Sequence, residues 1–460
     1  VAGVNAGNSI TSGGNYNTVV GDEAGTAITT GDRNSAVGMS ALVANTTGSF
    51  NAALGYESLK ANTTGGQNTG LGDRTLLANT TGALNTAVGQ GSLAANTTAS
   101  NNVAVGVAAL EANTTGTENV AVGASALTDN TTNGYNTAVG FESLKVNTTG
   151  NKNTAVGRKS LAANTTGIEN VAVGYDCLDA NTTASGNTAI GKSALGANTT
   201  GASNTSVGKS ALQLNTTGAN NTASGFEALR YNTTGARNVA IGEGALYSNT
   251  TATNNTVIGT YAGDGVTTGI ANILIGYQAG KYNTPLTTGT ENTIIGAYAY
   301  PSASDTSSAN ALGYNIIAVS GYTTIGSATN DIRAAHGNTT WATVSDERYK
   351  KDITTSTAGL SFINDLTPRT WNYKTLGELP ETFSAYKADS TEVFKNTQTN
   401  HGFIAQEVKA VIDNHSEIKD GFRLWDDRPD GSQEVAEAAL IPVLVKALQE
   451  LSAKNDALET

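Results

Sequence analysis

The sequence predicts a mainly β protein, in which a repetitive parallel β-roll or β-solenoid shaft is followed by a small α+β domain that ends in a coiled-coil helix. Three observations predict this architecture. Glycine recurs at every seventeenth position from Gly21 to Gly276, the triplet Asn-Thr-Thr recurs with the same period from residue 45 to residue 249, and the composition changes near Trp341. A fixed period of this length is typical of stacked repeats.

One repeat unit reads N-T-A-V-G-F-E-S-L-K-V-N-T-T-G-N-K at residues 136–152. Val, Ile or Leu precedes the glycine in nearly every copy, and a leucine stands four residues after it in thirteen consecutive copies, from Leu42 to Leu246. Seventeen residues are too few for two helices and a turn, whereas β-branched residues, Gly and Asn-Thr favour short strands and turns. Each unit therefore predicts one coil of a stack.

Stacking places equivalent residues of successive coils about 4.8 Å apart, so sixteen coils would form a rod roughly 70 to 80 Å long. We expect the Leu and Val columns to point inward and the glycine to supply a positive φ at the corner. Asn and Thr are expected to form hydrogen-bonded ladders between coils. Because so small a coil has a thin interior, we expect several chains to pack together.

The repeat resembles the head of YadA-like trimeric autotransporter adhesins. The resemblance covers residues 15–326 and rests on motifs such as N-T-A-V-G at 136–140 and N-V-A-V-G at 170–174. It implies a left-handed parallel β-roll assembled as a homotrimer. The inserted A-N-T-T segment departs from the shorter adhesin unit, and it affects the expected handedness and coil shape more than the stacking.

We divide the chain into a shaft at 1–296, an irregular junction or shaft cap at 297–340, and a terminal domain at 341–460. The glycine spacing changes after Gly276, and tyrosines gather there, at positions 277, 282, 298, 300, 314 and 322. They predict either a receptor-facing surface or a cap packed between chains.

The terminal domain shows helical and extended patterns in turn. Leu360, Ile363 and Leu366 predict a short helix that ends near Pro368 and is followed by a strand. The run H-G-F-I-A-Q-E-V-K-A-V-I at 401–412 predicts a strand and then a helix. A last helix is expected from about Val435 to Leu458.

Apolar residues of this last helix alternate at spacings of three and four, which is the a and d pattern of a coiled coil. An asparagine at one a position could fix the register. The predicted trimerisation residues are Ile441, Leu444, Leu448, Leu451, Asn455 and Leu458.

Residues 341–460 resemble the C-terminal intramolecular chaperone and auto-processing domain of phage tailspikes, endosialidases and L-shaped tail fibres. The matching motifs are S-D-E-R-Y-K-K-D-I at 345–353, L-x-P-x-x-W-x-Y at 366–373, G-F-I-A-Q-E-V at 402–408 and L-I-P-V-L-V-K-A-L-Q-E-L at 440–451. The resemblance implies that the domain trimerises, directs the folding of the fibre before it, and cuts itself off with a Ser/Lys dyad.

A serine hydroxyl becomes a nucleophile when a base takes its proton, and a lysine can serve as that base when burial or a neighbouring cation lowers its pKa. We therefore assign Ser345 as nucleophile and Lys350 as general base. By the resemblance the scissile bond is Ser345-Asp346, whereas acyl-shift chemistry would favour Val344-Ser345. Asp346 and Arg348 are expected to position the segment. His401, just before the G-F-I-A-Q-E-V motif, is the candidate for a supporting role.

Composition excludes several classes of function. The net charge of −12 gives no basic footprint for nucleic acid, and the absence of an apolar run long enough to cross a bilayer predicts no membrane insertion. The single Cys177 excludes an internal disulfide and is expected to be a small buried residue. His336, His401 and His415 lack metal-ligand spacing, so we expect packing or surface residues and neither a metal nor a cofactor. Since residue 1 is not Met, we expect a native N-terminal part to be missing.

The leading hypothesis is a homotrimeric viral tail fibre or tailspike that binds a host-cell receptor, a glycan or a protein, as part of the virion. Its terminal domain would act as a single-turnover serine peptidase on its own chain and on no external substrate. The alternatives are a bacterial trimeric adhesin at the cell surface and a polysaccharide-degrading tailspike. Shaft carboxylates such as Asp73 and Glu227 lack the paired arrangement of a glycan hydrolase.

Overall fold

The structure is a computed structural model, and it describes residues 3–10, 13–328, 330–337, 342–343, 347, 350, 352–383, 385–418, 424–427 and 433–459. The chain divides into two compact units, Val1–Val344 and Ser345–Thr460. Each unit is described by itself.

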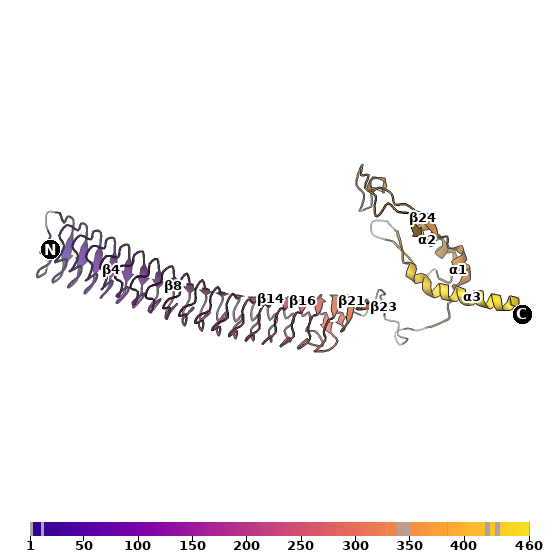
Figure 1. Cartoon of the computed structure of the whole chain (residues 1–460), viewed down its shortest axis with the longest axis horizontal. Helices are drawn as coiled ribbons and strands as arrows, with labels where there is room; N and C mark the ends of the chain where they lie inside the picture. The colour runs from indigo at the N-terminus through magenta and orange to yellow at the C-terminus, as the bar shows by residue number, and fades with distance from the viewer. Residues whose placement is uncertain are drawn as a thin grey trace. The chain divides into compact units, whose positions relative to one another are not determined.

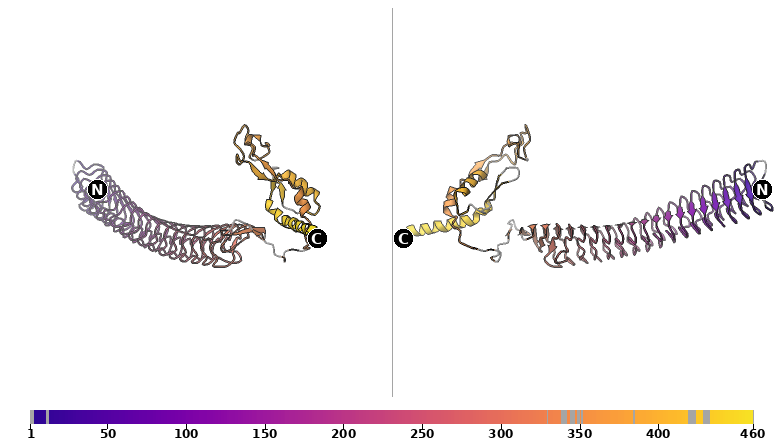
Figure 2. Two further views of the ribbon diagram at one scale, coloured as in Figure 1. Left: turned by 45° about the vertical axis from the view of Figure 1, so that its right-hand side comes forward. Right: turned by 180° about the vertical axis from the view of Figure 1, so that it is seen from behind.

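The first unit is a stack of coils in which each three-residue strand pairs in parallel with the strand of the next coil (Figure 1). In β8 Thr137–Val139 and β9 Thr154–Val156, Thr137 lies opposite Thr154 and Ala138 opposite Ala155, which is a shift of one repeat unit. Figure 2 shows this unit as a curved stack. The prediction of a mainly β protein with a parallel β-solenoid of seventeen-residue coils is confirmed.

The strands of this parallel column are β1 Thr18–Val20, β2 Ser35–Val37, β3 Ala52–Leu54, β4 Thr69–Leu71, β5 Thr86–Val88, β6 Val103–Val105, β7 Val120–Val122, β8 Thr137–Val139, β9 Thr154–Val156, β10 Val171–Val173, β11 Thr188–Ile190, β12 Thr205–Val207, β13 Thr222–Ser224, β14 Val239–Ile241, β15 Thr256–Ile258, β16 Ile273–Ile275, β17 Thr293–Ile295, β19 Asn310–Tyr314 and β21 Tyr322–Ser327.

The column continues through the segment that we assigned to an irregular junction. β19 and β21 extend the parallel sheet, and β18 Tyr300–Pro301 pairs with β20 Ile317–Ala318 beside it. β22 Asn330–Ala335 then pairs antiparallel with β21, and β23 Ala342–Thr343 pairs antiparallel with β22. The parallel stack thus ends in an antiparallel hairpin that covers the edge of β21.

The interior of most coils holds a leucine, the small residue before it and the middle residue of the strand, which is usually alanine. Leu144 and Ala138 are fully buried, so the predicted inward Leu column is confirmed. The predicted inward Val column is wrong, because Thr137 and Val139 flank the buried Ala138 and point outward. Alternate residues of a strand face opposite sides, and in these strands the middle residue is the one that faces inward. The Val and Ile side chains therefore form a stripe on the outer face of the sheet.

The corner glycines are required both by backbone conformation and by space. Gly140 has a φ of +135°, and a Cβ there would lie 2.5 Å from the carbonyl oxygen of Gly157 in the next coil. The thirteen column leucines also adopt left-handed backbone, with φ between 50° and 54°, which is unfavourable for a branched residue. Hydrogen bonds between coils hold this conformation, such as that from the Leu144 N–H to the Ser160 carbonyl at 2.9 Å.

Buried asparagines connect the coils in two ladders. In one ladder, Asn62 Nδ2 donates to Asn45 Oδ1 at 2.7 Å, and in the other the Asn51 backbone N–H donates to Asn34 Oδ1 at 2.9 Å. The hydroxyl of Thr46 donates to the carbonyl of Thr63 at 3.1 Å. The predicted Asn and Thr ladders are therefore confirmed, and they satisfy amide groups that burial would otherwise leave unpaired.

Cys177 is the small buried residue that its position predicts. Its thiol lies 3.2 Å from the carbonyl oxygen of Ala189, and burial raises the pKa of the Cys177 thiol to about 12. Because the thiolate is the reactive form, we expect this buried thiol to be unreactive at neutral pH.

The second unit combines short helices and two-stranded sheets around a small core. Its elements are α1 Leu360–Asp365, β24 Arg369–Trp371, η2 Leu376–Glu378, β25 Asn400–Gly402, α2 Ala405–Asn414, β26 Trp425–Asp427, β27 Gln433–Val435, η3 Glu437–Leu440 and α3 Ile441–Glu459. β24 pairs antiparallel with β25, and β26 with β27. The core includes Ala358, Phe362, Val408, Ile412, Leu424 and Val443.

The predicted helix before Pro368, the strand after it and the strand-to-helix segment at 401–412 are present. The last helix begins later than predicted, because β27 occupies residues up to Val435 and α3 starts at Ile441. Pro442 explains this start, since proline is tolerated in the first turn of a helix and interrupts its interior. Within the described residues, the structure contains no helix with the length and apolarity needed to cross a membrane.

Candidate self-processing site

The predicted nucleophile and its neighbours Asp346 and Arg348 lie outside the described residues. Lys350 is described, is exposed, and its backbone N–H donates to the carbonyl of Glu347 at 2.9 Å. The border between the two compact units falls between Val344 and Ser345. The predicted dyad therefore belongs to the first residues of the second unit.

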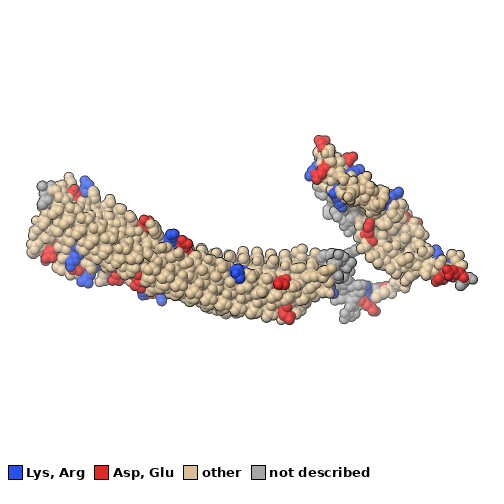
Figure 3. All heavy atoms as spheres, viewed as in Figure 1, with Lys and Arg blue, Asp and Glu red and all other residues tan. Residues whose placement is uncertain are grey.

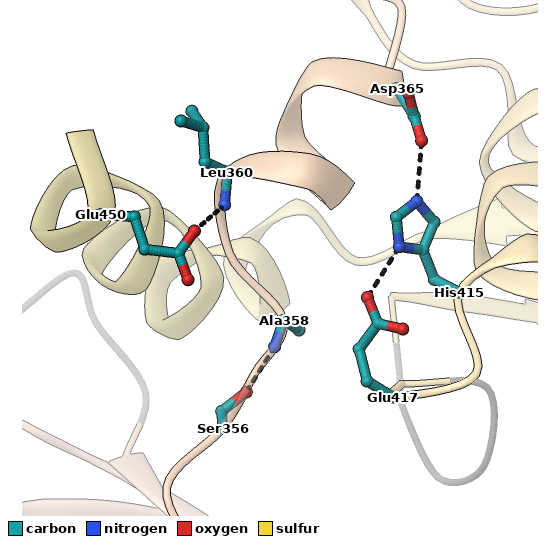
Figure 4. A network of polar contacts seen from close by, with 7 residues as sticks. All are labelled: Ser356, Ala358, Leu360, Asp365, His415, Glu417 and Glu450. Carbon is teal, nitrogen blue, oxygen red and sulfur yellow. Dashed lines mark hydrogen bonds and ion pairs between the residues drawn. The ribbon is translucent and has the colours of Figure 1, made fainter. Parts of the chain in front are cut away.

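The segment that follows Lys350 is attached to the last helix. At the start of α1, the Leu360 backbone N–H donates to Oε2 of Glu450 on α3 at 2.9 Å, as Figure 4 shows. A carboxylate in this place satisfies a free N–H at a helix start and interacts favourably with the helix dipole. Phe362 of α1 is fully buried in the core. Glu450 thus joins α3 to the start of α1. The two bonded residues, Leu360 and Glu450, are 90 positions apart in the chain.

His415 forms a second link within this unit, between two carboxylates (Figure 4). Its Nδ1 lies 2.7 Å from Glu417 Oε1, its Nε2 lies 2.8 Å from Asp365 Oδ2 at the end of α1, and its ring meets Phe362 edge to face. The Glu417 and then the Asp365 carboxylates raise the pKa of His415, and His415 lowers the pKa of Glu417. Both ring nitrogens can donate only when the imidazole is protonated.

From the sequence we expected only a packing or surface role for His415, and its contacts with Asp365 and Glu417 were not predicted. Asp365 is 50 residues away in the chain, and no spacing rule connects such positions. The other two histidines are exposed. His336 Nε2 lies 3.3 Å from Thr323 Oγ1 in the first unit, and His401, the candidate for a supporting role, lies in the middle of β25 opposite Thr370.

We expect the stabilisation from His415 to depend on pH. Because its pKa is raised above the ordinary value of 6.5 in the folded unit, this stabilisation is present below 6.5 and is lost as the pH rises through the folded-state pKa. The substitution His415→Gln should therefore destabilise the second unit by about 1 kcal/mol at pH 5.5 and by less at pH 8.5. Thermal unfolding followed by tryptophan fluorescence measures this, since Trp371 and Trp425 both lie in the unit. An equal loss of stability at both pH values would contradict the pairing of a protonated His415 with the two carboxylates.

Comparison with known proteins now assigns the second unit. The family model described as the chaperone of endosialidase, a peptidase family, matches residues 345–417. Residues 345–417 of the second unit thus match a chaperone-of-endosialidase domain, and we call this unit the chaperone domain. This family consists of self-cleaving chaperone domains. The matched segment follows a parallel β-solenoid in this chain, and this arrangement fits a tail fibre with a C-terminal chaperone domain. Searches of curated proteins and of solved structures found no match.

The last helix of the chaperone domain has two different apolar sides. Val443 and Ala447 are buried against the domain's own core, together with Leu440 just before the helix. The predicted trimerisation leucines and isoleucine are instead exposed, with exposed fractions of 61% for Ile441, 42% for Leu444, 65% for Leu448, 52% for Leu451 and 86% for Leu458. Asn455 is also exposed. Large exposed apolar residues at a and d spacing on one helix are typical of an association surface.

The chaperone domain also contains a shallow cleft between α1, β24 and α2. Leu366, Phe403, Val408 and Val411 contribute apolar lining. Arg369 bridges the rim with a paired contact to both carboxylate oxygens of Glu407, each at 2.9 Å. Among the described residues, no group of His, Cys, Asp and Glu side chains is arranged to hold a metal ion.

Proposed function

We propose that this chain is a trimeric viral tail fibre or tailspike protein for host attachment, whose chaperone domain drives assembly of the shaft and then cuts itself off at Ser345. The observation that carries the proposal is a coincidence of position. The chaperone-of-endosialidase match begins at residue 345, where the first compact unit ends and the second begins. A fibre of this kind would stand in the virion and bind a glycan or protein receptor on the host surface.

A cut on either side of Ser345 separates the two units without breaking a described strand pairing. β23 ends at Thr343, so it remains with β22 in the released shaft. β22 in turn keeps the edge of β21 paired. An unpaired sheet edge invites aggregation, and a cut at this point leaves the shaft with its covered edge.

Two exposed apolar surfaces support assembly from three copies. The first is the outer side of α3, defined by Ile441, Leu444, Leu448, Leu451 and Leu458, which has the a and d spacing of a coiled coil. The second is the stripe on the outer face of the shaft sheet, where Leu54, Ile190, Ile241 and Ile258 are exposed. Both surfaces would be buried if copies of the chain packed side by side in register.

The chemistry follows from the residue types at 345–350. The Ser345 hydroxyl would attack the scissile carbonyl carbon while its proton passes to the Lys350 amine, and the departing amide nitrogen would take a proton. Water would then hydrolyse the resulting ester. Since Lys350 is exposed in the single chain, the burial that makes a lysine a base would come from neighbouring copies. Cutting would then follow correct assembly.

The test is to express the full chain with Ser345→Ala and with Lys350→Ala. Ser361→Ala and Lys374→Ala are matched controls, because both residues are exposed in the same unit. We expect the unaltered chain and both controls to yield a released fragment of about 115 residues on denaturing gels and by intact mass, and both site variants to remain uncut. Release of that fragment by either site variant would contradict the assignment.

A further inference from the structure

Tyrosines are concentrated in the last coils of the shaft. Half of the sixteen tyrosines of the chain lie between residues 231 and 314. These eight are Tyr231, Tyr247, Tyr261, Tyr277, Tyr282, Tyr298, Tyr300 and Tyr314. Neither the folding of the coils nor the cutting of the chain, as argued above, uses them.

Five of these tyrosines form one connected cluster, which we call the tyrosine cluster: Tyr277, Tyr282, Tyr298, Tyr300 and Tyr314. Tyr298 is at its centre, with ring centroids 5.2 Å from Tyr277, 4.9 Å from Tyr282 and 5.8 Å from Tyr314. Tyr282 also meets Tyr300 at 5.9 Å. All four contacts are edge to face, which is a favourable geometry for aromatic pairs. The rings therefore hold one another in place.

The cluster forms where the repeat changes its length. Gly296 follows Gly276 at the twentieth position instead of the seventeenth, and β16 and β17 still pair in register. The longer loop includes Tyr282, which reaches Tyr298 of the next coil. Tyr277 directly follows Gly276, and Tyr314 directly follows Gly313, so these two rings occupy equivalent places in different coils. The longer coil thus gathers rings from successive coils on one part of the surface.

The cluster is open to solvent and lies in a segment of low charge. Tyr277 is 43% exposed, Tyr282 38% and Tyr314 54%. Residues 277–314 contain only three charged side chains, Lys281, Glu291 and Asp305. The ammonium of Lys281 pairs with Asp264 at 2.5 Å. The view in Figure 3 likewise shows few charged side chains on the shaft.

We propose that the tyrosine cluster binds a neutral carbohydrate. The C–H faces of a sugar ring are apolar and its edge is polar, and a tyrosine offers the same combination of an apolar ring and a hydroxyl. Rings that are already held in place lose little conformational freedom on binding. The proposal rests on the proposed host attachment and names the receptor chemistry. The α3 face and the sheet stripe, whose exposed Leu, Ile and Val side chains carry no hydroxyls, are the surfaces for contact between copies.

The experiment measures binding of the labelled full chain to immobilised neutral oligosaccharides of glucose, galactose and N-acetylglucosamine, with sialylated and sulfated oligosaccharides beside them. Tyr282→Ala and Tyr314→Ala are compared with Tyr135→Ala, a 58% exposed tyrosine elsewhere on the shaft. We expect binding to at least one neutral oligosaccharide, a loss of about tenfold in affinity in each cluster variant, and no change in the control.

Three results would overturn the inference: no binding to any neutral oligosaccharide, binding that the cluster variants leave unchanged, or loss of assembly in the cluster variants alone. The last result would make the cluster a contact between copies. Native mass and fragment release are measured on the same samples. A cut trimer that binds no neutral sugar would refute carbohydrate binding and leave the proposed assembly and cutting intact. An uncut monomer that binds neutral sugar through the cluster would refute the proposed assembly and cutting and support carbohydrate binding.

Discussion

The variant Leu448→Asp will remain a single, uncut chain. Leu448 is 65% exposed at the middle of the outer side of α3, between Leu444 and Leu451. A carboxylate there would have to be buried without a partner on association, which costs several kcal/mol for each copy. If Lys350 becomes a base only on assembly, loss of association also stops the cut. Native mass and denaturing gels measure the two effects on one sample.

The control for this prediction is Ala453→Asp, which adds the same charge further along the same helix. Ala453 is exposed and lies outside the a and d positions. We expect it to assemble and to be cut as the unaltered chain is. Assembly and cutting of Leu448→Asp, or equal failure of Ala453→Asp, would show that the outer side of α3 does not hold the copies together.

Gly140→Ala is expected to disrupt the stacking between the coil that contains residue 140 and the next coil. The φ of +135° at Gly140 is unfavourable for alanine, and the added Cβ would lie 2.5 Å from the Gly157 carbonyl oxygen. The backbone of two coils would have to move apart, at a cost on the order of 3 kcal/mol. Because each coil contacts only its neighbours, the damage should remain local. Hydrogen exchange should then show lost amide protection in the coils on either side of residue 140.

Gly91→Ala is the matched control for Gly140→Ala. Gly91 has a φ of +69°, but the nearest atom to an added Cβ there lies 3.8 Å away. The equivalent position holds Arg74 in the coil before and Ala108 in the coil after, with φ of 54° and 56°. We expect unchanged protection in this variant. If amide protection in Gly140→Ala equals that of the unaltered chain, the coils do not approach each other as closely as they do in the structure.

The stack could be predicted from sequence because one short-range rule repeats along it. A glycine at every seventeenth position and a leucine four positions later define a coil, and identical coils stack in register. The inward facing that we predicted for the Val column is wrong, since a strand of only three residues shows no alternation to count. Ala138 rather than Val139 is buried because the interior is narrow, a property of the closed coil and not of its local sequence.

Fewer features of the chaperone domain could be predicted. Its motifs predicted a terminal domain from residue 341 and a heptad pattern on the last helix, whereas the second compact unit begins at Ser345. The contact from Glu450 to Leu360 and the position of His415 between Asp365 and Glu417 join residues far apart in the chain. Such contacts depend on how the helices pack, and no periodicity or spacing in the sequence encodes them. The start of α3 at Ile441 could have been predicted from Pro442.

The native mass of the uncut Ser345→Ala chain tests the proposed assembly most directly. We propose that a stack of nearly identical coils is brought into register with its partners by a chaperone that is afterwards removed. We therefore expect an assembly of three chains of 46.7 kDa each. A single chain of 46.7 kDa, stable and fully folded at micromolar concentration, would contradict it.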